Sequence, residues 1–374
     1  MDLSDLRKQI DAADDELLAA YIKRLALVEE VGARKRAHAA AVEHEDRERQ
    51  LLARLTEKFG KEREHDIRFL YGAILSYSKI IQSRGSGEEF APPASPSENA
   101  LNKRGLRIAC QGVEGAYSHA AAGEMFSRPE ILRCETFSEV FDCVSEGKAD
   151  FGVLPAENST AGSVNEVYDL LKEHKLRIAA ARKLRIDHCL LALSGAREED
   201  IRTVLSHPQA LAQCSKYIRE KKLSAKECLN TAGAARQVGS GGDKTVAAIA
   251  SASAAERYGL SVLASGIQNE GQNHTRFIAV AGGDYAPFTG ANKLSAVLTL
   301  PHRSGSLYTL LNIIAAYGAN LTKLESRPIP GTDFEFTFYI DLEGSDGSPR
   351  IRELLAAAKA YCAEFVYLGS YPES

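Results

Sequence analysis

The feature that most restricts the fold is the absence of proline from residues 2 to about 83, at the start of the chain. Across it, apolar residues return every three or four positions, beginning at Leu3. That period matches the turn of an α-helix and not the two-residue period of a strand. Ser4 or Asp5 is the expected N-cap of the first helix. The pattern predicts three helices, ending near residue 37 and spanning 46–59 and 62–83.

A change of composition follows this helical stretch. Residues 84–104 are rich in Gly, Ser, Pro and Glu and have almost no large apolar side chains, which is typical of a flexible linker. Beyond Leu106, short apolar runs alternate with amphipathic stretches, which predicts an α/β domain with a mostly parallel sheet, as one body or two lobes. The expected strands are 107–110, 151–154, 189–193, 203–206 and 246–250, and the expected helices are 138–146, 164–174 and 210–221.

A smaller unit is predicted from Lys293 onward. Its strands and helices follow the order strand, helix, strand, strand, helix, strand, which is the ferredoxin-like arrangement. Its second strand is expected over 319–327 and its last over 365–368. We therefore expect four segments, with bounds 1–84, 85–104, 105–284 and 293–374.

Charge and cysteine usage exclude several classes of partner. The 374 residues carry 46 Lys and Arg against 50 Asp and Glu, so a net charge of −4 attracts neither nucleic acid nor an anionic membrane. The 7 cysteines are scattered and never spaced as CxxC, which favours reduced thiols over disulfides or a metal site. No apolar run reaches the roughly 18 residues of a membrane span, and the first residues do not resemble a signal peptide. We expect a cytoplasmic protein with no bound metal.

Basic residues on the predicted first helix suggest a site shared by two chains. Arg24 and Lys35 are 11 positions apart, so they face within about 20° of each other with Cα atoms roughly 16 Å apart. Arg7 lies 17 positions before Arg24, about 100° off that face and roughly 25 Å away. One straight helix cannot bring Arg7 and Arg24 to one small ligand, but an antiparallel helix from a second chain can. On spacing alone, solvated basic residues remain the better interpretation.

With the other two helices included, the segment resembles the all-helical chorismate mutase family. The second helix carries DRERQLLARL at 46–55, which is similar to that family's second helix, and Ser78 and Gln82 stand at i, i+4 on the third. The resemblance implies an intertwined dimer in which one cation comes from the partner chain. It implies that chorismate is bound by Arg7 of the partner chain and by Arg24, Lys35, His44, Arg47, Glu48, Ser78 and Gln82.

The mutase reaction suits such residues. Chorismate rearranges to prephenate in one pericyclic step, so the protein needs no cofactor and only has to hold the folded conformer and stabilise charge on the ether oxygen. The resemblance places Lys35 and Gln82 at that oxygen as the catalytic residues. His44 stands where the enteric form of the family has aspartate, which leaves recognition of the substrate hydroxyl open.

Four polar clusters mark the predicted α/β domain. They are Gly112–His119, Pro155–Gly162, Ser206–Gln209 with Gln213, and Asn273–Phe277. Each alone fits an ordinary cap or turn, and the first is neither GxGxxG nor a P-loop, so no nucleotide is implied. Together they resemble the prephenate dehydratase motifs GxxGxYSHxA, PxENSxxG and TRF.

That second resemblance implies a two-lobed α/β fold similar to periplasmic binding proteins, with the site between the lobes. The reaction expels CO2 and hydroxide from prephenate, so the protein must donate a proton to the leaving hydroxyl. Thr275 is the expected donor, and His119 and His207 could titrate near pH 7 or serve as structural turn residues. The residues implied at prephenate are Ser118, Glu157, Asn158, Ser159, Ser206, Gln213, Thr275 and Arg276.

The last segment resembles an ACT domain of the phenylalanine-regulated type. Its ESRP sequence at 325–328 matches the signature of those members, and GSLY at 305–308 departs moderately from the Gly-Ala-Leu-Val of the enteric family. The resemblance implies feedback inhibition by L-phenylalanine bound between paired domains; the alternative is a purely structural dimerisation module. The implied effector residues are Gly305, Ser306, Leu307, Glu325, Ser326, Arg327 and Pro328.

Nearly the whole chain thus resembles a bifunctional family in which a chorismate mutase is joined to a prephenate dehydratase. We expect a homodimer or a larger assembly, a cofactor-free conversion of chorismate through prephenate to phenylpyruvate, and release of prephenate to solvent rather than channelling. Three alternatives stay open at this stage: a non-catalytic amino-acid sensor, a mutase fused to a dehydrogenase, and arogenate as the dehydratase substrate.

Overall fold

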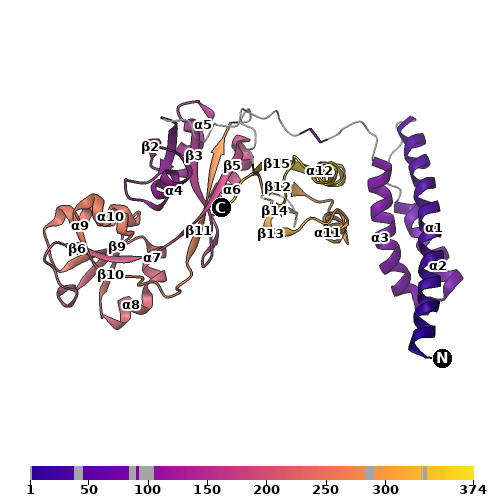
Figure 1. The fold of residues 1–374 in the computed structure, drawn as a ribbon, viewed down its shortest axis with the longest axis horizontal. Coiled ribbons are helices and arrows are strands. Elements are labelled where there is room, and N and C mark those ends of the chain that lie inside the picture. The colour runs from indigo at the N-terminus through magenta and orange to yellow at the C-terminus, as the bar shows by residue number, and fades with distance from the viewer. Residues whose placement is uncertain are drawn as a thin grey trace. The chain divides into compact units, whose positions relative to one another are not determined.

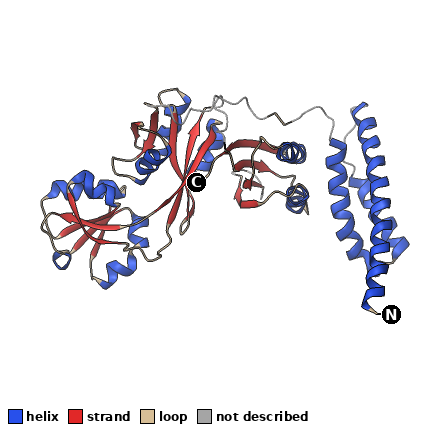
Figure 2. Cartoon of the chain, viewed as in Figure 1, coloured by secondary structure: helices blue, strands red, loops and turns tan. Residues whose placement is uncertain are grey.

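The computed structural model describes residues 2–37, 45–83, 90–91, 105–282, 290–329, 331 and 335–374. These form two compact units, one made of Met1–Pro92 with Val297–Phe365 and the other of Pro93–Ala296 with Val366–Ser374. Figure 2 distinguishes the purely helical beginning of the chain from the mixed helices and strands that follow.

The three predicted helices are confirmed. They are α1 (Leu3–Ala37), α2 (Glu45–Phe59) and α3 (Glu64–Ser83), with one 3₁₀ turn, Lys61–Arg63, before α3 (Figure 1). The predicted N-cap was wrong, because the side chain of Asp2 accepts a hydrogen bond from the backbone N–H of Asp5 at 2.8 Å. A carboxylate just ahead of the first turn satisfies a backbone donor that has no partner within the helix.

The apolar residues of α1 divide into two groups. Val28 is buried within the three-helix segment, as are Leu55 of α2 and Ile80 and Ile81 of α3. Eight other large side chains of α1 are 44 to 64 % exposed: Leu3, Leu6, Ile10, Leu17, Leu18, Ile22, Leu27 and Val31. A long helix that leaves so much apolar surface uncovered is typical of one that packs against a second protein surface.

The α/β segment has two lobes, as predicted. The sheet of the first lobe has the strand order β2-β1-β3-β11-β5, with β4 paired to β3, and that of the second has the order β10-β6-β9-β7-β8. The first-lobe strands are β1 (Arg107–Gln111), β2 (Glu130–Cys134), β3 (Phe151–Asn158), β4 (Gly162–Ser163), β5 (Arg177–Arg185) and β11 (His274–Ala281). The second-lobe strands are β6 (Cys189–Leu193), β7 (Thr203–Ser206), β8 (Ser224–Glu227), β9 (Val246–Ala250) and β10 (Leu260–Ser265).

Helices flank both sheets. In the first lobe they are α4 (Tyr117–Met125), α5 (Phe137–Ser145) and α6 (Asn165–His174). In the second lobe they are α7 (Pro208–Gln213), α8 (Ser215–Glu220), α9 (Thr231–Gly241) and α10 (Ala252–Tyr258), with a 3₁₀ turn at Glu198–Asp200.

The prediction of a mostly parallel sheet was wrong, because both sheets are mixed. β11 runs antiparallel to both of its neighbours, β3 and β5. In the second lobe β6 is antiparallel to both β9 and β10. The chain leaves the first lobe at the end of β5 and re-enters it at the start of β11 at a neighbouring point, so these two strands run in opposite directions.

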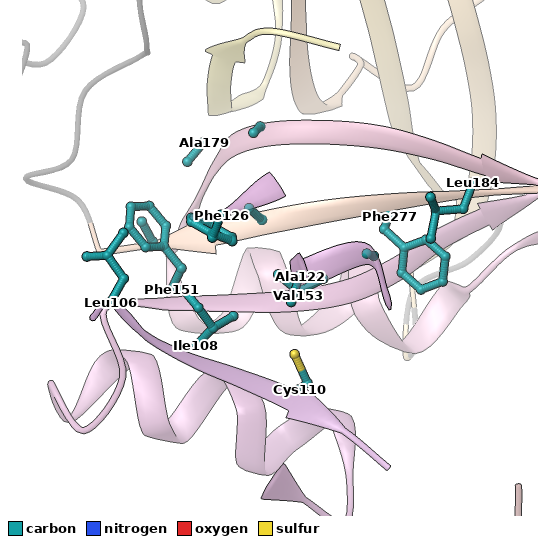
Figure 3. Close-up of a cluster of buried hydrophobic side chains, with 14 of the residues drawn as sticks. Leu106, Ile108, Cys110, Ala122, Phe126, Phe151, Val153, Ala179, Leu184 and Phe277 are labelled. Carbon is teal, nitrogen blue, oxygen red and sulfur yellow. The ribbon is translucent and has the colours of Figure 1, made fainter. Parts of the chain in front are cut away.

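A buried cluster fixes the strands of the first lobe (Figure 3). Ile108 of β1 and Phe151 and Val153 of β3 are fully buried, and Phe277 of β11 joins them. The rings of Phe126 and Phe151 lie 5.0 Å apart between centroids. Since each buried residue of this size stabilises the fold by roughly 1.5–3 kcal/mol, the cluster holds β3 and β11 in a set register.

The chain crosses between the lobes twice, and the two crossings lie side by side. The first runs from β5 to β6 and the second from β10 to β11. The backbone N–H of Ile186 donates to the carbonyl of Asn273 at 2.8 Å, and that of Ile267 donates to the carbonyl of His188 at 3.1 Å. The crossings therefore form one hydrogen-bonded ribbon between the lobes.

The helix predicted over 210–221 is interrupted at Cys214, which separates α7 from α8. The side chain of Asn269, from the second crossing, enters at this break. It donates to the carbonyl of Ala212 and to Ser215, and it accepts from the backbone N–H of Lys216, all within 3.1 Å. The break is thus satisfied by a residue far along the chain, which helical periodicity does not reveal.

The ferredoxin-like order of the last segment is confirmed. Its sheet has the order β13-β14-β12-β15, with two helices between strands in the chain. The strand β15 is longer than predicted and ends at residue 371. The elements are β12 (Lys293–Thr299), α11 (Ser306–Ala316), β13 (Leu321–Pro328), β14 (Phe336–Glu343), α12 (Pro349–Tyr361) and β15 (Glu364–Tyr371). Among the described residues, no helix is both long and apolar enough to span a membrane.

Candidate active sites

The first site is built on the helical segment. The fold brings Arg24 of α1 beside Ser78 of α3, where Arg24 Nη1 donates to Ser78 Oγ at 2.5 Å. The Ser78 hydroxyl in turn donates to the carbonyl of Ile74 and is buried. Two predicted residues that stand 54 positions apart are thereby joined, and the guanidinium is held on the α3 face of α1.

The other residues predicted to bind chorismate differ in their partners and in their burial. Glu48 of α2 forms an ion pair with Lys79 of α3 at 2.9 Å, a contact that sequence reasoning missed. Lys35 and Gln82 are partly buried, whereas Arg7 and Arg47 are exposed. The remaining predicted residue, at position 44, lies outside the described residues.

The second site is centred on Thr275 at the start of β11. Thr275 pairs in register with Asn158, which ends β3, and both are buried. Asn158 Nδ2 donates to Thr275 Oγ1 at 2.9 Å. Because the Thr275 oxygen accepts this bond, its own hydrogen is not consumed there and can be donated to a bound molecule.

The orientation of the Asn158 amide follows from its surroundings. Its Oδ1 accepts from the backbone N–H groups of Thr160 and Ala161, at 3.1 and 3.0 Å, and from the Thr160 hydroxyl at 2.7 Å. Since backbone N–H groups can only donate, the carbonyl end must face this turn and the NH2 end must face Thr275. The direction of the Asn158–Thr275 hydrogen bond is therefore determined.

The second lobe contributes Gln213, at the end of α7. Its Nε2 donates to Asn158 Oδ1 at 3.3 Å and to Thr160 Oγ1 at 2.9 Å, and its Oε1 accepts from Asn273 Nδ2 at 3.2 Å. Asn273 Oδ1 also accepts from Asn158 Nδ2 at 2.8 Å. The three amides form a closed network that joins the lobes next to Thr275.

His188, in the first crossing, extends this network and was missed from the sequence. Its Nε2 lies 3.0 Å from Gln213 Oε1, and its ring meets that of Tyr117 edge to face at 6.0 Å. Burial lowers the pKa of His188, although the hydrogen bond to Gln213 acts in the opposite direction. The imidazole is therefore neutral at pH 7, with its proton on Nε2 facing the amide oxygen.

Other residues predicted at prephenate lie nearby or serve the local structure. Ser159 Oγ accepts from the backbone N–H of His274 at 3.0 Å. Ser206 is fully buried and donates to the carbonyl of Ile249 at 2.5 Å. Ser118 is buried in the first turn of α4, and Glu157 pairs in register with Arg276. The structure thus gathers Asn158, Gln213 and Thr275 and places Ser206 within the second sheet.

The glycine-rich loop packs against the second lobe. A Cβ on Gly115, whose φ is +88°, would lie 3.2 Å from the backbone of Ala254, so this close approach requires glycine. Ser251 donates to the Gly115 carbonyl at 3.1 Å. Beside the loop lies a cavity of about 420 Å³ lined by Glu114, Gly115, Ala116, His119, Ala120, Ser253, Glu256 and Arg257.

The two histidines left open by the sequence have local partners. His119 Nδ1 accepts from the backbone N–H of Gly115 at 3.4 Å, and His207 Nδ1 caps α7 by accepting from that of Gln209 at 3.2 Å. Burial lowers the pKa of both rings. These contacts favour the structural role for each histidine.

The predicted effector residues lie at two places in the ferredoxin-like segment. Gly305 has φ +83° and precedes α11, whose first residue, Ser306, is buried and donates to the carbonyl of Pro301 at 2.6 Å. Glu325, Ser326, Arg327 and Pro328 end β13, the edge strand of the sheet. Glu325 Oε2 lies 3.3 Å from Lys323 Nζ. No group of three His, Cys, Asp or Glu side chains that could hold a metal occurs in the described parts of the chain.

Two family models match the chain. The prephenate dehydratase model matches residues 108–284, and the chorismate mutase type II model matches residues 6–83. The bifunctional chorismate mutase/prephenate dehydratase of Escherichia coli (strain K12) is 33% identical over 380 residues, which cover 98% of this chain and 95% of that protein. Arogenate dehydratase 2 of Petunia hybrida is 40% identical over 294 residues, 75% of each chain.

Two solved structures have a fold similar to that of this chain over the part that they cover. The prephenate dehydratase of Arthrobacter aurescens, solved in complex with L-Phe, is 28% identical with a TM-score of 0.64, and the match covers 71% of this chain and 90% of that one. GqqA, described as a novel type of quorum quenching acylase, is 34% identical with a TM-score of 0.65, over 72% of this chain and 98% of that one.

Proposed function

The chain belongs to the family of bifunctional chorismate mutase/prephenate dehydratases, and from that premise we propose which residues carry each of its two reactions. It is a chorismate mutase and a prephenate dehydratase of phenylalanine biosynthesis.

The mutase site is proposed to form between two copies of the chain. Arg24, aligned by Ser78, binds one substrate carboxylate, and Arg7 of the partner subunit binds another, with Arg47 nearby. Lys35 and Gln82 stabilise the negative charge that develops on the ether oxygen, which is the main contribution that a protein can make to a pericyclic step. Glu48, held by Lys79, faces the substrate hydroxyl.

The exposed apolar side chains of α1 support the dimer. These eight large side chains are 44 to 64 % exposed, so covering the rest of each gains about half of the roughly 1.5–3 kcal/mol that full burial gives. A second copy has the same exposed apolar side chains, so an antiparallel pairing of the two α1 helices covers the apolar surface of both, as expected for a two-fold interface. The same pairing brings Arg7 of one chain toward Arg24 of the other. A measurement of mass in solution distinguishes a dimer from an association of two dimers.

Subunit mixing tests the shared mutase site. Arg7→Ala and Arg24→Ala should each abolish mutase activity, because each removes a carboxylate-binding cation from every site. A mixed dimer contains one site with both arginines and one with neither, so random mixing should restore about a quarter of the wild-type activity. Heterodimers that are shown to form but stay inactive would contradict the proposal.

The dehydratase reaction is proposed to centre on Thr275. The bond to the ring carboxylate breaks and releases CO2, its electron pair enters the ring, and the ring hydroxyl leaves as water after it takes up a proton. Thr275 donates to that leaving oxygen, and the hydrogen bond from Asn158 stabilises negative charge on Thr275 Oγ1, which lowers the cost of donation. The Asn158–Thr275 hydrogen bond is the single observation that carries this assignment.

A substitution that keeps the shape of Thr275 tests its role. Thr275→Val removes the hydroxyl and should lower dehydratase kcat by about 10²–10³-fold, the usual cost of one lost transition-state donor. Mutase activity in the same chain should not change, since that site is elsewhere. Full dehydratase activity of the variant would disprove the assignment.

We propose that L-phenylalanine inhibits the dehydratase by binding at the residues around Gly305 and along 325–328. The support is that the Arthrobacter aurescens relative was solved with L-Phe, and that Gly305 holds a left-handed turn at the start of α11. The edge position of β13 lets a second copy of the segment pair beside it.

Two glycines provide a matched test of the effector site. Gly305 and Gly331 have φ of +83° and +81°, and a Cβ on either would have no neighbour within 4 Å. Alanine at either position therefore introduces the same backbone strain, about 1–2 kcal/mol. Gly305→Ala should weaken inhibition by L-phenylalanine and Gly331→Ala should not. Equal inhibition of both variants would place the effector elsewhere.

The substrate of the second reaction is proposed to be prephenate, since the mutase of the same chain produces it. Arogenate is the alternative that a specific observation favours, because the Petunia hybrida relative is an arogenate dehydratase. Comparing kcat/KM for the two acids with the purified protein decides between them.

We also propose the segment bounds 1–84, 85–104, 105–284 and 293–374, and a cytoplasmic location suited to free cysteines such as the pair Cys134 and Cys143.

A further inference from the structure

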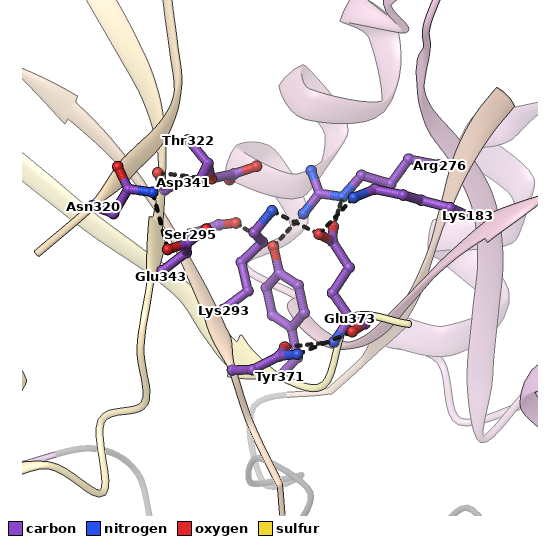
Figure 4. Close-up of polar contacts among 11 residues, drawn as sticks. Lys183, Arg276, Lys293, Ser295, Asn320, Thr322, Asp341, Glu343, Tyr371 and Glu373 are labelled. Carbon is purple, nitrogen blue, oxygen red and sulfur yellow. Dashed lines mark hydrogen bonds and ion pairs between the residues drawn. The ribbon is translucent and has the colours of Figure 1, made fainter. Parts of the chain in front are cut away.

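The residue after Thr275 is held by an unusual set of charges (Figure 4). Arg276 is buried, and its Nε lies 2.6 Å from Glu373 Oε1. Its Nη2 donates to the hydroxyl of Tyr371 at 2.5 Å, and that hydroxyl lies 2.5 Å from Ser295 Oγ. Arginine can only donate, so the Tyr371 oxygen accepts from Arg276, whereas in the contact between Tyr371 and Ser295 either hydroxyl can be the donor.

Glu373 is the centre of this cluster. Lys293 Nζ and Lys183 Nζ lie 2.6 and 3.1 Å from its Oε2, so one carboxylate faces three cations. Its side chain is only 9 % exposed and that of Arg276 only 7 %, whereas that of Lys183 is 55 % exposed. Burial alone would raise the pKa of Glu373, but Arg276 and Lys293 outweigh it and hold the pKa below its ordinary value.

The backbone places Glu373 there. The N–H of Ala181 donates to the carbonyl of Pro372 at 2.9 Å, and the N–H of Lys183 donates to that of Ser374 at 2.9 Å. Ala181 and Glu373 thus form a parallel bridge along β5, the edge strand of the first-lobe sheet. Residues 366–374 accordingly belong to the same compact unit as the dehydratase lobes.

The position of Arg276 on β11 connects this cluster to the reaction. Successive side chains of a strand point to opposite faces of the sheet, so Arg276 lies on the face opposite Thr275. The register of β11 against β3 is irregular between Arg276 and Phe277. β11 thus pairs irregularly with β3 just after Arg276 but pairs with β5 in continuous register from His274 to Ala279, so an anchored Arg276 side chain helps to hold the adjoining backbone at Thr275.

We propose that Tyr371 and Glu373 are positioning residues of the dehydratase: by fixing Arg276 they set the orientation of Thr275 toward the leaving hydroxyl. The inference rests on the proposed role of Thr275. It also implies that removing residues 293–374 would take away Lys293, Tyr371 and Glu373, so loss of dehydratase activity in such a truncation says nothing about the effector. Point substitutions in the full chain are the sharper test.

Glu373→Gln and Tyr371→Phe are the test variants, and Lys183→Gln is the matched control. Glu373→Gln removes the carboxylate between the cations, and Arg276 shifts. A displacement of about 1 Å can lower a rate by about 100-fold, so we expect dehydratase kcat to fall about 10- to 100-fold with KM within about threefold. Tyr371→Phe removes the hydroxyl that contacts both Arg276 and Ser295, and it should lower kcat by about five- to tenfold. Lys183→Gln takes one half-exposed cation from the other oxygen of the same carboxylate and leaves the contacts of Arg276 with Glu373 and Tyr371 in place, so kcat should stay within about twofold.

Thermal unfolding and mutase activity are measured for each variant, and Thr275→Val is assayed alongside. A fall in melting temperature with an unchanged kcat for Glu373→Gln and Tyr371→Phe would mean a merely structural role and overturn the inference. If Glu373→Gln does not fold, Tyr371→Phe alone decides. An active Thr275→Val overturns the proposed function itself, whereas an inactive Thr275→Val beside fully active Tyr371→Phe and Glu373→Gln overturns only this inference.

Discussion

Asn158→Asp should convert Thr275 from a hydrogen-bond donor toward substrate into a donor toward the protein. The Asn158 side chain accepts four hydrogen bonds through Oδ1, and aspartate can keep all of them. The two hydrogens of its Nδ2 face three acceptors, Asn273 Oδ1, the His274 carbonyl and Thr275 Oγ1, and aspartate loses these contacts. The Thr275 hydroxyl then turns to the new carboxylate, which consumes its hydrogen.

The size of the effect follows from that exchange. One lost transition-state donor costs about 3 kcal/mol, which lowers kcat by about 10²–10³-fold. Stability should also fall, by about 1–3 kcal/mol for each of the lost contacts to Asn273 and the His274 carbonyl, whose oxygens then face a carboxylate, while Thr275 keeps a hydrogen bond with reversed direction. Since domains of this kind have about 5–15 kcal/mol of stability, the variant should remain folded.

The assay is single-turnover formation of phenylpyruvate from prephenate, with thermal unfolding as the second measurement. Asn230→Asp is the control, because Asn230 caps α9 by accepting from the Gly233 N–H at 2.6 Å and aspartate caps equally well. As the pH falls, protonation of the introduced carboxylate supplies an O–H donor again, so the activity of the Asn158→Asp variant relative to wild type should rise. A kcat within about threefold of wild type at neutral pH would refute the reasoning.

Three further predictions concern stability. Burial holds the pKa of His188 in the folded protein below its ordinary value. The contribution of the neutral ring to the free energy of unfolding is therefore complete above the pKa of about 6.5 in the unfolded chain and is lost as the pH falls below it. Thermal unfolding between about pH 5 and 8 should show a shallower pH dependence in His188→Gln than in wild type. Asp2→Ala should lower the free energy of unfolding of the helical segment by about 1 kcal/mol through loss of the α1 cap, measured by chemical denaturation, and an unchanged midpoint would argue against the cap. Asn269→Ala removes three hydrogen bonds at the break between α7 and α8 and should cost about 1–3 kcal/mol in the same measurement, with a rise in the KM for prephenate because Gln213 lies at that break.

Much of the fold could be predicted because the pattern of the sequence is local. β6, β7 and β9 have the bounds expected from their short apolar runs. These strands are buried in the second-lobe sheet, so almost every residue between two polar flanks had to be apolar. The long helix α1 followed equally well from a proline-free stretch with a helical period.

What could not be predicted depends on contacts between distant segments. The register of β11 brings Thr275 against Asn158 across 117 positions, and Gln213 reaches the same amide from the other lobe. His188 carries no motif, and its only signal in the sequence is its place just before β6. The direction of β11 was also hidden, because an apolar run fits a parallel or an antiparallel neighbour equally well.

The paired crossings make the second lobe a self-contained insertion. Its strands β6 to β10 occupy one continuous stretch, and the chain leaves and re-enters the first lobe at points joined by backbone hydrogen bonds. A replacement lobe can be joined at residues 188 and 267, since these attachment points are neighbours in space. It must also fit the loop at Gly115 and the amide network at Asn158. Chimeras that exchange this stretch among relatives would carry a new Gln213 environment against an unchanged Thr275 and Asn158, and so could separate substrate choice from the chemistry of proton donation.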